Sequence, residues 1–148
     1  MSYKGRYSPK NPKKYLGDPS NIIYRSLWER KCMVRFDEDD QIVQWGSEEI
    51  SIPYVSPVDN QLHRYFPDFV IKARQPDGTH VVRIIEVKPM HECKAPVKKK
   101  KVTRKYIAEV MKYGVNQAKW EAATNYALNR GWQFKVITEN DIFPKGHK

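Results

Sequence analysis

The segment from Tyr65 to Lys88 constrains the fold of this chain more than any other stretch. It contains two runs of β-branched and aromatic residues, which favour strands, on either side of Gln75-Pro76-Asp77-Gly78-Thr79. Proline at the first turn position and glycine at the last are typical of a three-residue loop in which a left-handed residue follows a type I turn. We therefore predict an antiparallel hairpin with strands at about 63–74 and 79–88.

The register of this hairpin brings three charged side chains together. A three-residue loop pairs Gln75 with Thr79, and counting back seven positions on each strand sets Asp68 opposite Glu86. Lys88 shares the face of Glu86 because side chains alternate along a strand. A two-residue loop would turn Asp68 to the other face, so the prediction depends on the turn.

Two carboxylates that face each other repel, because their Cβ atoms are only about 5 Å apart. A divalent cation compensates for this repulsion. Carboxylate oxygens suit Mg²⁺ or Mn²⁺, and Mg²⁺ commonly takes one or two carboxylates together with water and a substrate phosphate. The residues alone leave an alternative open, in which Lys88 bridges Asp68 and Glu86 as an ordinary salt-bridge cluster.

Basic residues are clustered in this chain, which carries a net charge of +10. Residues 88–105 hold eight Lys/Arg against one acid. Such clustering is expected of a protein with a polyanionic partner, because each phosphate neutralised by Lys or Arg releases condensed counterions. Basic segments also occur as solubilising tails or as anchors to acidic protein or lipid surfaces. We expect DNA contacts from Lys98, Lys99, Lys100, Lys101, Arg104, Lys105 and Lys119.

Residues 1–20 are rich in Lys, Pro, Tyr, Gly and Ser and show no periodicity. They are expected to form a basic N-terminal arm that docks only by its aromatic residues. Three tyrosines in this arm are candidates for contact with DNA or a partner: Tyr3, Tyr7 and Tyr15.

A helix and two strands are predicted between the arm and the hairpin. Ser26 and Glu29 fit a capping box that opens a helix reaching about residue 36. Short strands are expected at 42–45 and 48–55. Pro53 indicates that the second strand lies at a sheet edge or contains a bulge, because proline cannot donate a hydrogen bond to the ladder.

The hairpin is followed by a predicted mobile, Lys-rich loop at about 89–102. A helix is expected at 103–113, which Gly114 weakens, and Asn116 can then cap a second helical stretch to about residue 130. The final strand, at 133–138, joins the hairpin through a crossover connection.

The length of 148 residues corresponds to about one domain, which we assign to residues 21–148. No apolar run approaches the roughly 20 residues that span a bilayer. The N-terminus lacks the apolar region of a signal peptide. We therefore expect a soluble, intracellular protein with no membrane partner.

Asp68 followed by Glu86-Val87-Lys88 resembles the D…(D/E)xK signature of the PD-(D/E)xK nucleases, and Pro67 supplies the leading proline. Over about residues 20–140 the chain is similar to the N-terminal nuclease domain of the transposon end-cleaving subunit. This similarity rests on SLWERK, DEDD, IVQWGSEEISIPY, RYFPDF and IIEVK, in that order. The whole chain also resembles the head completion proteins of T-even-type tailed phages. These resemblances imply an α/β fold with a restriction-endonuclease-like mixed β-sheet flanked by helices.

The nuclease resemblance implies a role for each residue that matches the signature. Asp68 and Glu86 match the principal metal ligands, with the Val87 carbonyl as a further ligand. Lys88 matches the lysine that orients the attacking water. Glu29 matches a helix glutamate that helps to hold the metal, directly or through water. Its alternative role, as the N3 carboxylate of the capping box, competes for the same side chain.

Gln117, near the start of the late helix, is a further catalytic candidate, for contact with the attacking water or a phosphate. Its alternative is an ordinary exposed helix residue. The implied activity is that of a Mg²⁺- or Mn²⁺-dependent DNA endonuclease, without a small-molecule cofactor, that acts in phage head completion after DNA packaging. The alternative is a non-catalytic assembly protein that binds DNA or the portal vertex.

The phage resemblance also implies partners and a location. Besides DNA, the expected partners are the phage head, its portal or other head completion proteins. The expected location is the host cytoplasm during phage assembly, with a place as a minor component of the virion.

Overall fold

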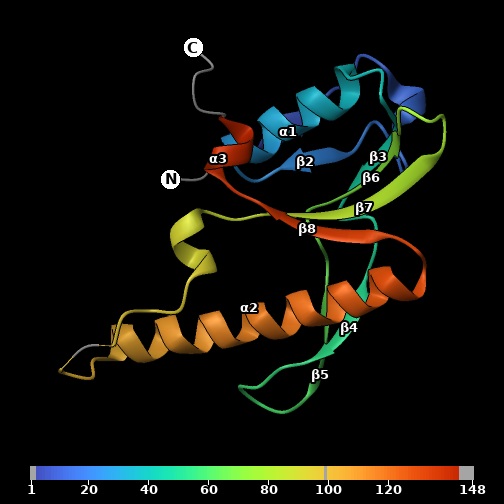
Figure 1. Cartoon of the computed structure of the whole chain (residues 1–148). Coiled ribbons are helices and arrows are strands. Elements are labelled where there is room, and N and C mark those ends of the chain that lie inside the picture. Colours follow the sequence, from blue (N-terminus) through green and yellow to red (C-terminus); the bar gives the residue numbers. More distant parts are fainter. Residues whose placement is uncertain (1–2, 99, 144–148) are drawn as a thin grey trace.

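A four-stranded mixed sheet forms the centre of the protein, whose computed structural model describes residues 3–98 and 100–143 (Figure 1). The strands, in sheet order, are β3 (Ile42–Ser47), β6 (Phe69–Arg74), β7 (His80–Val87) and β8 (Gln133–Ile137). Strand β7 pairs antiparallel with β6 and parallel with β8, and β3 pairs antiparallel with the other edge of β6. This arrangement confirms the predicted mixed sheet.

The hairpin turn between β6 and β7 has the predicted geometry. The Gly78 N–H donates to the Gln75 carbonyl at 2.9 Å, and the Gln75 N–H donates to the Thr79 carbonyl at 2.7 Å. Gly78 has a φ of 87°, the left-handed conformation that glycine adopts without steric cost. Phe69 therefore pairs with Ile85, which is the predicted register.

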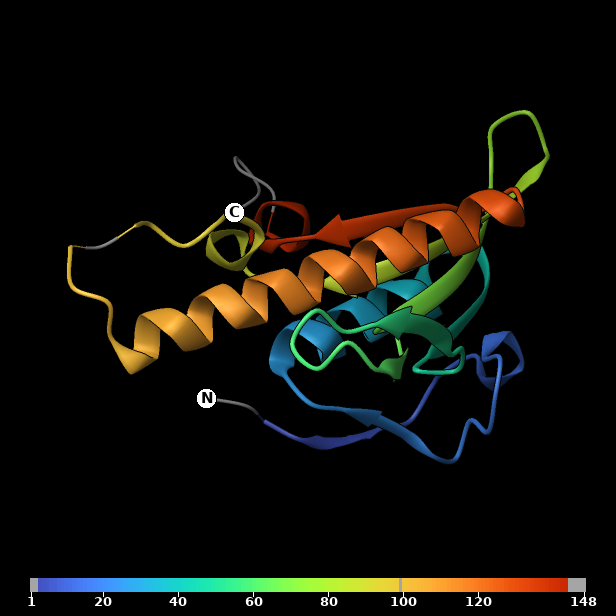
Figure 2. The same cartoon turned by 90° about the horizontal axis from the view of Figure 1, so that it is seen from below.

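Two helices cover opposite faces of the sheet: α1 (Leu27–Glu38) and α2 (Arg104–Asn129) (Figures 1 and 2). Because side chains alternate along β7, Ile85 joins the hydrophobic core that includes α1, and Ile84 joins the core that includes α2. The Ser26 hydroxyl caps α1 by accepting a hydrogen bond from the Glu29 N–H. The predicted start of this helix is confirmed.

The N-terminal arm packs onto the first core instead of lying free. Strand β1 (Gly5–Tyr7) pairs with β2 (Ile22–Tyr24), and the short 3-10 helix η1 (Pro12–Lys14) lies between them. Tyr7 and Tyr15 are buried, with their rings edge-on to Trp45. Their predicted contact with DNA or a partner is therefore wrong, because the core hides both side chains.

The predicted strand at 63–74 is two strands, not one. Strand β5 (Leu62–Tyr65) pairs with β4 (Ile52–Val55) in a separate ribbon, and β6 begins only at Phe69. Pro67, which has no N–H to donate, lies in the break between them. Strand β4 pairs with β5 alone among the described strands, so Pro53 lies in an edge strand, as predicted.

Helix α2 runs without interruption through Gly114, so the predicted division into two helical stretches, with Asn116 as the cap of the second, is wrong. A single glycine costs a helix only about 1 kcal/mol relative to alanine. The core contacts of Ala123 and Ala127 hold the second half of the helix in place. Thr103, at the predicted start, caps the helix through a hydrogen bond from the Tyr106 N–H.

Two short helices were not predicted. The 3-10 helix η2 (Met90–Cys93) lies in the predicted loop, and α3 (Glu139–Ile142) follows β8 with Thr138 as its cap. In the part of the chain that the structure describes, no helix has the length and hydrophobicity needed to cross a membrane.

Candidate active site

A cleft opens where β6 begins and β7 ends, beside the first turn of α1. Its volume is about 570 Å³. The cleft brings together the candidate residues that the sequence placed far apart, on one helix and two strands. It is lined by Tyr3, Ser26, Leu27, Trp28, Glu29, Asp68, Glu86, Val87, Lys88 and Pro89.

Asp68 and Glu86 face each other at the floor of the cleft and are held by defined hydrogen bonds. The Asp68 Oδ2 atom accepts from the Val87 N–H at 2.8 Å, and the Asp68 N–H donates to Glu86 Oε1 at 3.4 Å. The Tyr65 hydroxyl also donates to Glu86 Oε1, at 2.6 Å. Among the described residues, none donates to Asp68 Oδ1 or Glu86 Oε2. Each carboxylate therefore keeps one oxygen free for a ligand.

The electrostatics of the cleft disfavour two ionised carboxylates. Burial raises the pKa of Asp68 well above its usual value, and the Glu86 charge raises it further. Burial also raises the pKa of Glu86, while the Tyr65 hydrogen bond and the Lys88 charge lower it. Within the described residues, no ion pair joins Lys88 to either carboxylate, so the alternative of a simple salt-bridge cluster is not observed.

Glu29 lies on the same cleft but is partly engaged by its own helix cap. The Ser26 hydroxyl donates to Glu29 Oε2 at 3.1 Å and accepts from the Glu29 N–H at 3.2 Å. Burial raises the pKa of Glu29. Glu29 thus contacts the hydroxyl of its own helix cap while it lines the cleft, and its role at a metal stays a prediction.

The donor set of the cleft fits a magnesium-type ion. In the described residues, no group of three or more His, Cys, Asp or Glu side chains is close enough to hold a metal. Mg²⁺ does not need such a group, since it usually retains water and takes one or two carboxylates plus substrate phosphate. Asp68 Oδ1 and Glu86 Oε2 supply that minimum, and a cation between them would relieve their repulsion.

Tyr65 is a site residue that the sequence reasoning missed. Burial and the Glu86 charge raise the pKa of Tyr65, so its hydroxyl stays protonated and donates to Glu86. Lys119 lies over the Tyr65 ring, 5.6 Å from its centre, and its charge lowers the pKa of Glu86. No local sequence pattern identifies Tyr65 as a site residue, because β5 ends at Tyr65 and the interruption at Pro67 separates it from Asp68.

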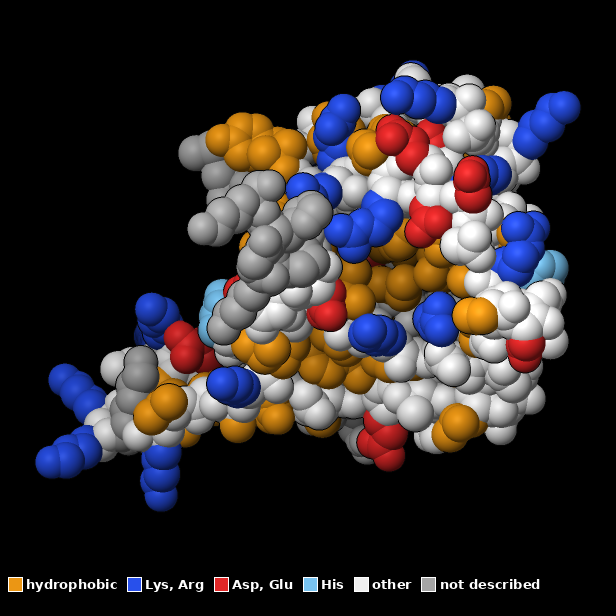
Figure 3. All heavy atoms as spheres, turned by 45° about the horizontal axis from the view of Figure 1, so that its top comes forward, with side chains coloured by type: hydrophobic (Ala, Val, Ile, Leu, Met, Phe, Trp, Pro, Cys, Tyr) orange, Lys and Arg blue, Asp and Glu red, His pale blue; other side chains and the backbone are white. Residues whose placement is uncertain are grey.

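The remaining predicted residues lie away from the floor of the cleft. Gln117 is exposed and does not line the cleft, so its catalytic role stays a prediction without support from this geometry. The predicted DNA-binding residues near the start of α2 are exposed, and Lys99 lies outside the described residues. Figure 3 shows Lys and Arg side chains extending from this projecting end of the molecule. The exposed ones are Lys98, Lys100, Lys101, Arg104 and Lys105.

Comparison with known proteins gives one family and one full-length relative. Residues 39–139 match the family described as TnsA-like endonuclease, N-terminal. The chain is 37% identical over 152 residues to the "Head completion nuclease" of Enterobacteria phage T4, an alignment that covers 100% of this chain and 99% of the relative. No solved structure matches the chain. The matched region contains Asp68, Glu86 and Lys88, and it begins after Glu29.

Proposed function

The chain belongs to the TnsA-like N-terminal endonuclease family, and from this premise we infer that it is a nuclease that acts in phage head completion. The second part of this inference rests on the name of the T4 relative, whose whole length aligns with this chain. We propose further that its substrate is DNA and that hydrolysis depends on Mg²⁺ or Mn²⁺. The fold that goes with this proposal is the restriction-endonuclease-like arrangement, a mixed sheet between helical layers with its catalytic residues at one end.

One observation carries the proposal: two opposed carboxylates in one cleft, each with a free oxygen, beside a lysine. Asp68 Oδ1, Glu86 Oε2 and the Val87 carbonyl would hold the cation, with Glu29 in reach through water. Such an ion, when bound, lowers the pKa of a bound water and offsets negative charge on the phosphate.

The surrounding residues have distinct tasks in this proposal. Lys88 orients the attacking water and stabilises the charge that develops on the phosphate oxygens. Tyr65 fixes the orientation of Glu86 through its 2.6 Å hydrogen bond. The exposed lysines and Arg104 near the start of α2 bind the DNA backbone, and Lys119 adds positive charge beside the floor of the cleft.

Plasmid cleavage with Mg²⁺ or Mn²⁺ tests the proposal. We expect the wild-type protein to nick or cut the plasmid, and Lys88→Ala to lower the rate by about 100-fold or more while DNA binding persists. Lys135→Ala, at an exposed position on β8, is the matched control and should cleave at the wild-type rate.

Two results would decide against this account. Absence of cleavage with every divalent metal would favour the alternative function, a non-catalytic assembly protein that binds DNA. Full activity of Lys88→Ala would show that the protein is a nuclease whose catalytic centre lies elsewhere.

A further inference from the structure

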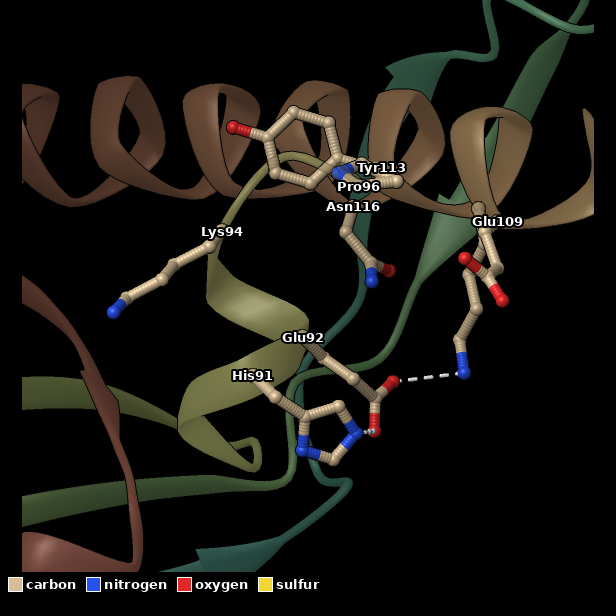
Figure 4. Close-up of a pocket in the computed structure, with 8 residues that line it drawn as sticks. His91, Glu92, Lys94, Pro96, Glu109, Tyr113 and Asn116 are labelled. Carbon is tan, nitrogen blue, oxygen red and sulfur yellow. Dashed lines mark ion pairs between the residues drawn. The ribbon is translucent and has the colours of Figure 1, made fainter. Parts of the chain in front are cut away.

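A second hollow, here called the side pocket, lies next to the cleft, between η2 and α2 (Figure 4). Neighbouring residues line the two hollows: Lys88 and Pro89 line the cleft, and His91 and Glu92 line the side pocket. Its volume is about 290 Å³. A molecule in the side pocket would therefore lie close to any phosphate in the cleft.

Asn116 supplies the side pocket with an unused recognition group. The residue as a whole is 6% exposed, and in the described part of the chain no side chain or backbone group forms a hydrogen bond with its amide. Figure 4 shows this amide facing the space in front of Glu92. The amide offers one donor and one acceptor side by side to a ligand.

The charges around the side pocket restrict that ligand. Glu92 forms an ion pair with Lys112 at 2.8 Å, and this partner lowers the pKa of Glu92, which stays an ionised acceptor. The lining carries two lysines, Lys94 and Lys112, against the two carboxylates Glu92 and Glu109, so it has no excess positive charge to hold an anion. The described residues offer no group of three metal-ligating side chains. A neutral ligand that carries an amino group fits this environment best.

The size and the walls of the side pocket point to a flat heterocycle. Ligand sites for drug-sized molecules begin at about 300 Å³, so a pocket of about 290 Å³ suits a small group such as a single ring system. Tyr113 and Pro96 form apolar parts of the wall. Flat bases stack on such surfaces in proteins that bind single strands.

We propose that the side pocket accepts one unpaired, amino-bearing nucleobase from the DNA strand whose phosphate occupies the cleft. This inference rests on the proposed nuclease function and specifies its substrate. The Asn116 amide pairs with the donor–acceptor edge of the base, and Glu92 accepts from its amino group. The base must be unpaired, because a stacked and paired base exposes neither that edge nor its faces. The preferred substrates are therefore DNA ends, branches or bulges with an unpaired nucleotide near the scissile bond.

Equilibrium binding without divalent metal tests this proposal, because no cleavage is needed. The probes are a fully paired duplex and the same duplex with one extra unpaired cytosine. We expect the wild-type protein to bind the bulged duplex roughly tenfold more tightly, the effect of one or two good hydrogen bonds. An unpaired thymine, which lacks the amino group, should lose most of this preference.

Asn116→Leu removes the amide while keeping a similar side-chain size, and Asn116→Ala provides a second variant. Both should abolish the preference for the bulged duplex without changing affinity for the paired one. Asn125→Ala, an exposed asparagine on the same helix, should retain it.

Equal affinity of the wild-type protein for the two duplexes would overturn the proposal, and this comparison does not depend on the folding of any variant. An unchanged preference in a folded Asn116→Leu protein would overturn it as well. Cleavage of a paired plasmid is read separately. Failure of the side-pocket proposal therefore leaves the nuclease proposal intact, and failure of the nuclease proposal appears as absent cleavage, which the binding comparison does not measure.

Discussion

At the scale of single residues, the ionised form of Asp68 is needed to bind a metal but destabilises the folded protein. Burial and the Glu86 charge raise its pKa, so the folded state binds a proton more tightly than the unfolded state does. Stability is therefore lost as the pH rises from the unfolded pKa through the folded one. Metal binding, which needs the ionised form, should strengthen over the same range.

Asp68→Asn should remove this cost, because an amide cannot ionise but can still accept from the Val87 N–H. Without divalent metal at pH 8, we expect the variant to gain about 0.5–2 kcal/mol in free energy of unfolding, as at other functional positions. Urea denaturation at pH 5 and pH 8 measures this, and the gain should shrink at pH 5. Asp40→Asn, at an exposed position, should show no such gain. A loss of stability at pH 8 would contradict the assigned electrostatics.

Tyr65 sets the orientation and the protonation of Glu86. Its hydrogen bond lowers the pKa of Glu86, so Tyr65→Phe should raise that pKa and shift the pH profile of cleavage to higher pH. At neutral pH we expect a rate loss of roughly tenfold, the worth of one hydrogen bond to a charged group. Tyr126→Phe removes a hydroxyl that has no hydrogen bond within the described residues and serves as the control. An unshifted profile in Tyr65→Phe would exclude this role.

These residues also show where sequence reasoning succeeds and where it stops. The position of Asp68 opposite Glu86 followed from local turn chemistry, because Gly78 fixes the loop length and the loop fixes the register. Tyr65 could not be found in this way. It approaches Glu86 from the separate β4–β5 ribbon, and its place depends on the packing of that ribbon against α2.

At the scale of elements, one buried carboxylate ties the N-terminal arm to the end of α1. Asp37 is fully buried and accepts from the Tyr7 hydroxyl at 2.8 Å and from the Lys10 and Asn11 N–H groups at 2.7 and 3.0 Å. Its own carbonyl accepts from the Lys14 ammonium at 2.8 Å. The arm is therefore an integral part of the first core.

Asp37→Ala should leave these buried donors without a partner. We expect a loss of about 3 kcal/mol in free energy of unfolding and earlier cleavage of the arm in limited proteolysis. Asp40→Ala, three residues further on and exposed, is the matched control for both measurements. Wild-type stability in Asp37→Ala would show that Tyr7 and Tyr15 hold the arm without the carboxylate.

The element predictions failed where tertiary packing overrides a local signal. Gly114 favours a helix end, but α2 continues through it because the core contacts beyond it hold the helix. The reading of 63–74 as one strand missed the effect of Pro67, which separates the ribbon strand β5 from the sheet strand β6. Helix starts at Ser26 and Thr103 were predictable, since a capping side chain acts on its own first turn.

At the scale of the whole molecule, the order of strands and helices in the sequence was enough to predict a mixed sheet with helical layers. Ile84 and Ile85 point to opposite faces of the sheet, so both faces are hydrophobic. Helix α1 packs on the face of Ile85 and helix α2 on the face of Ile84. The convergence of Glu29 on the hairpin carboxylates could not be derived from periodicity. The family resemblance predicted this convergence, and in the structure all three side chains line the same cleft.

The central claim is that Asp68 and Glu86 together hold a divalent cation, and a crystal soaked in Mn²⁺ tests it most directly. We expect an anomalous peak between the two side chains, about 2.0–2.3 Å from Asp68 Oδ1 and Glu86 Oε2. Crystals of Asp68→Asn soaked in the same way should lack the peak, and those of Asp40→Asn should keep it. A wild-type crystal with Mn²⁺ bound elsewhere, and none between these carboxylates, would contradict the account.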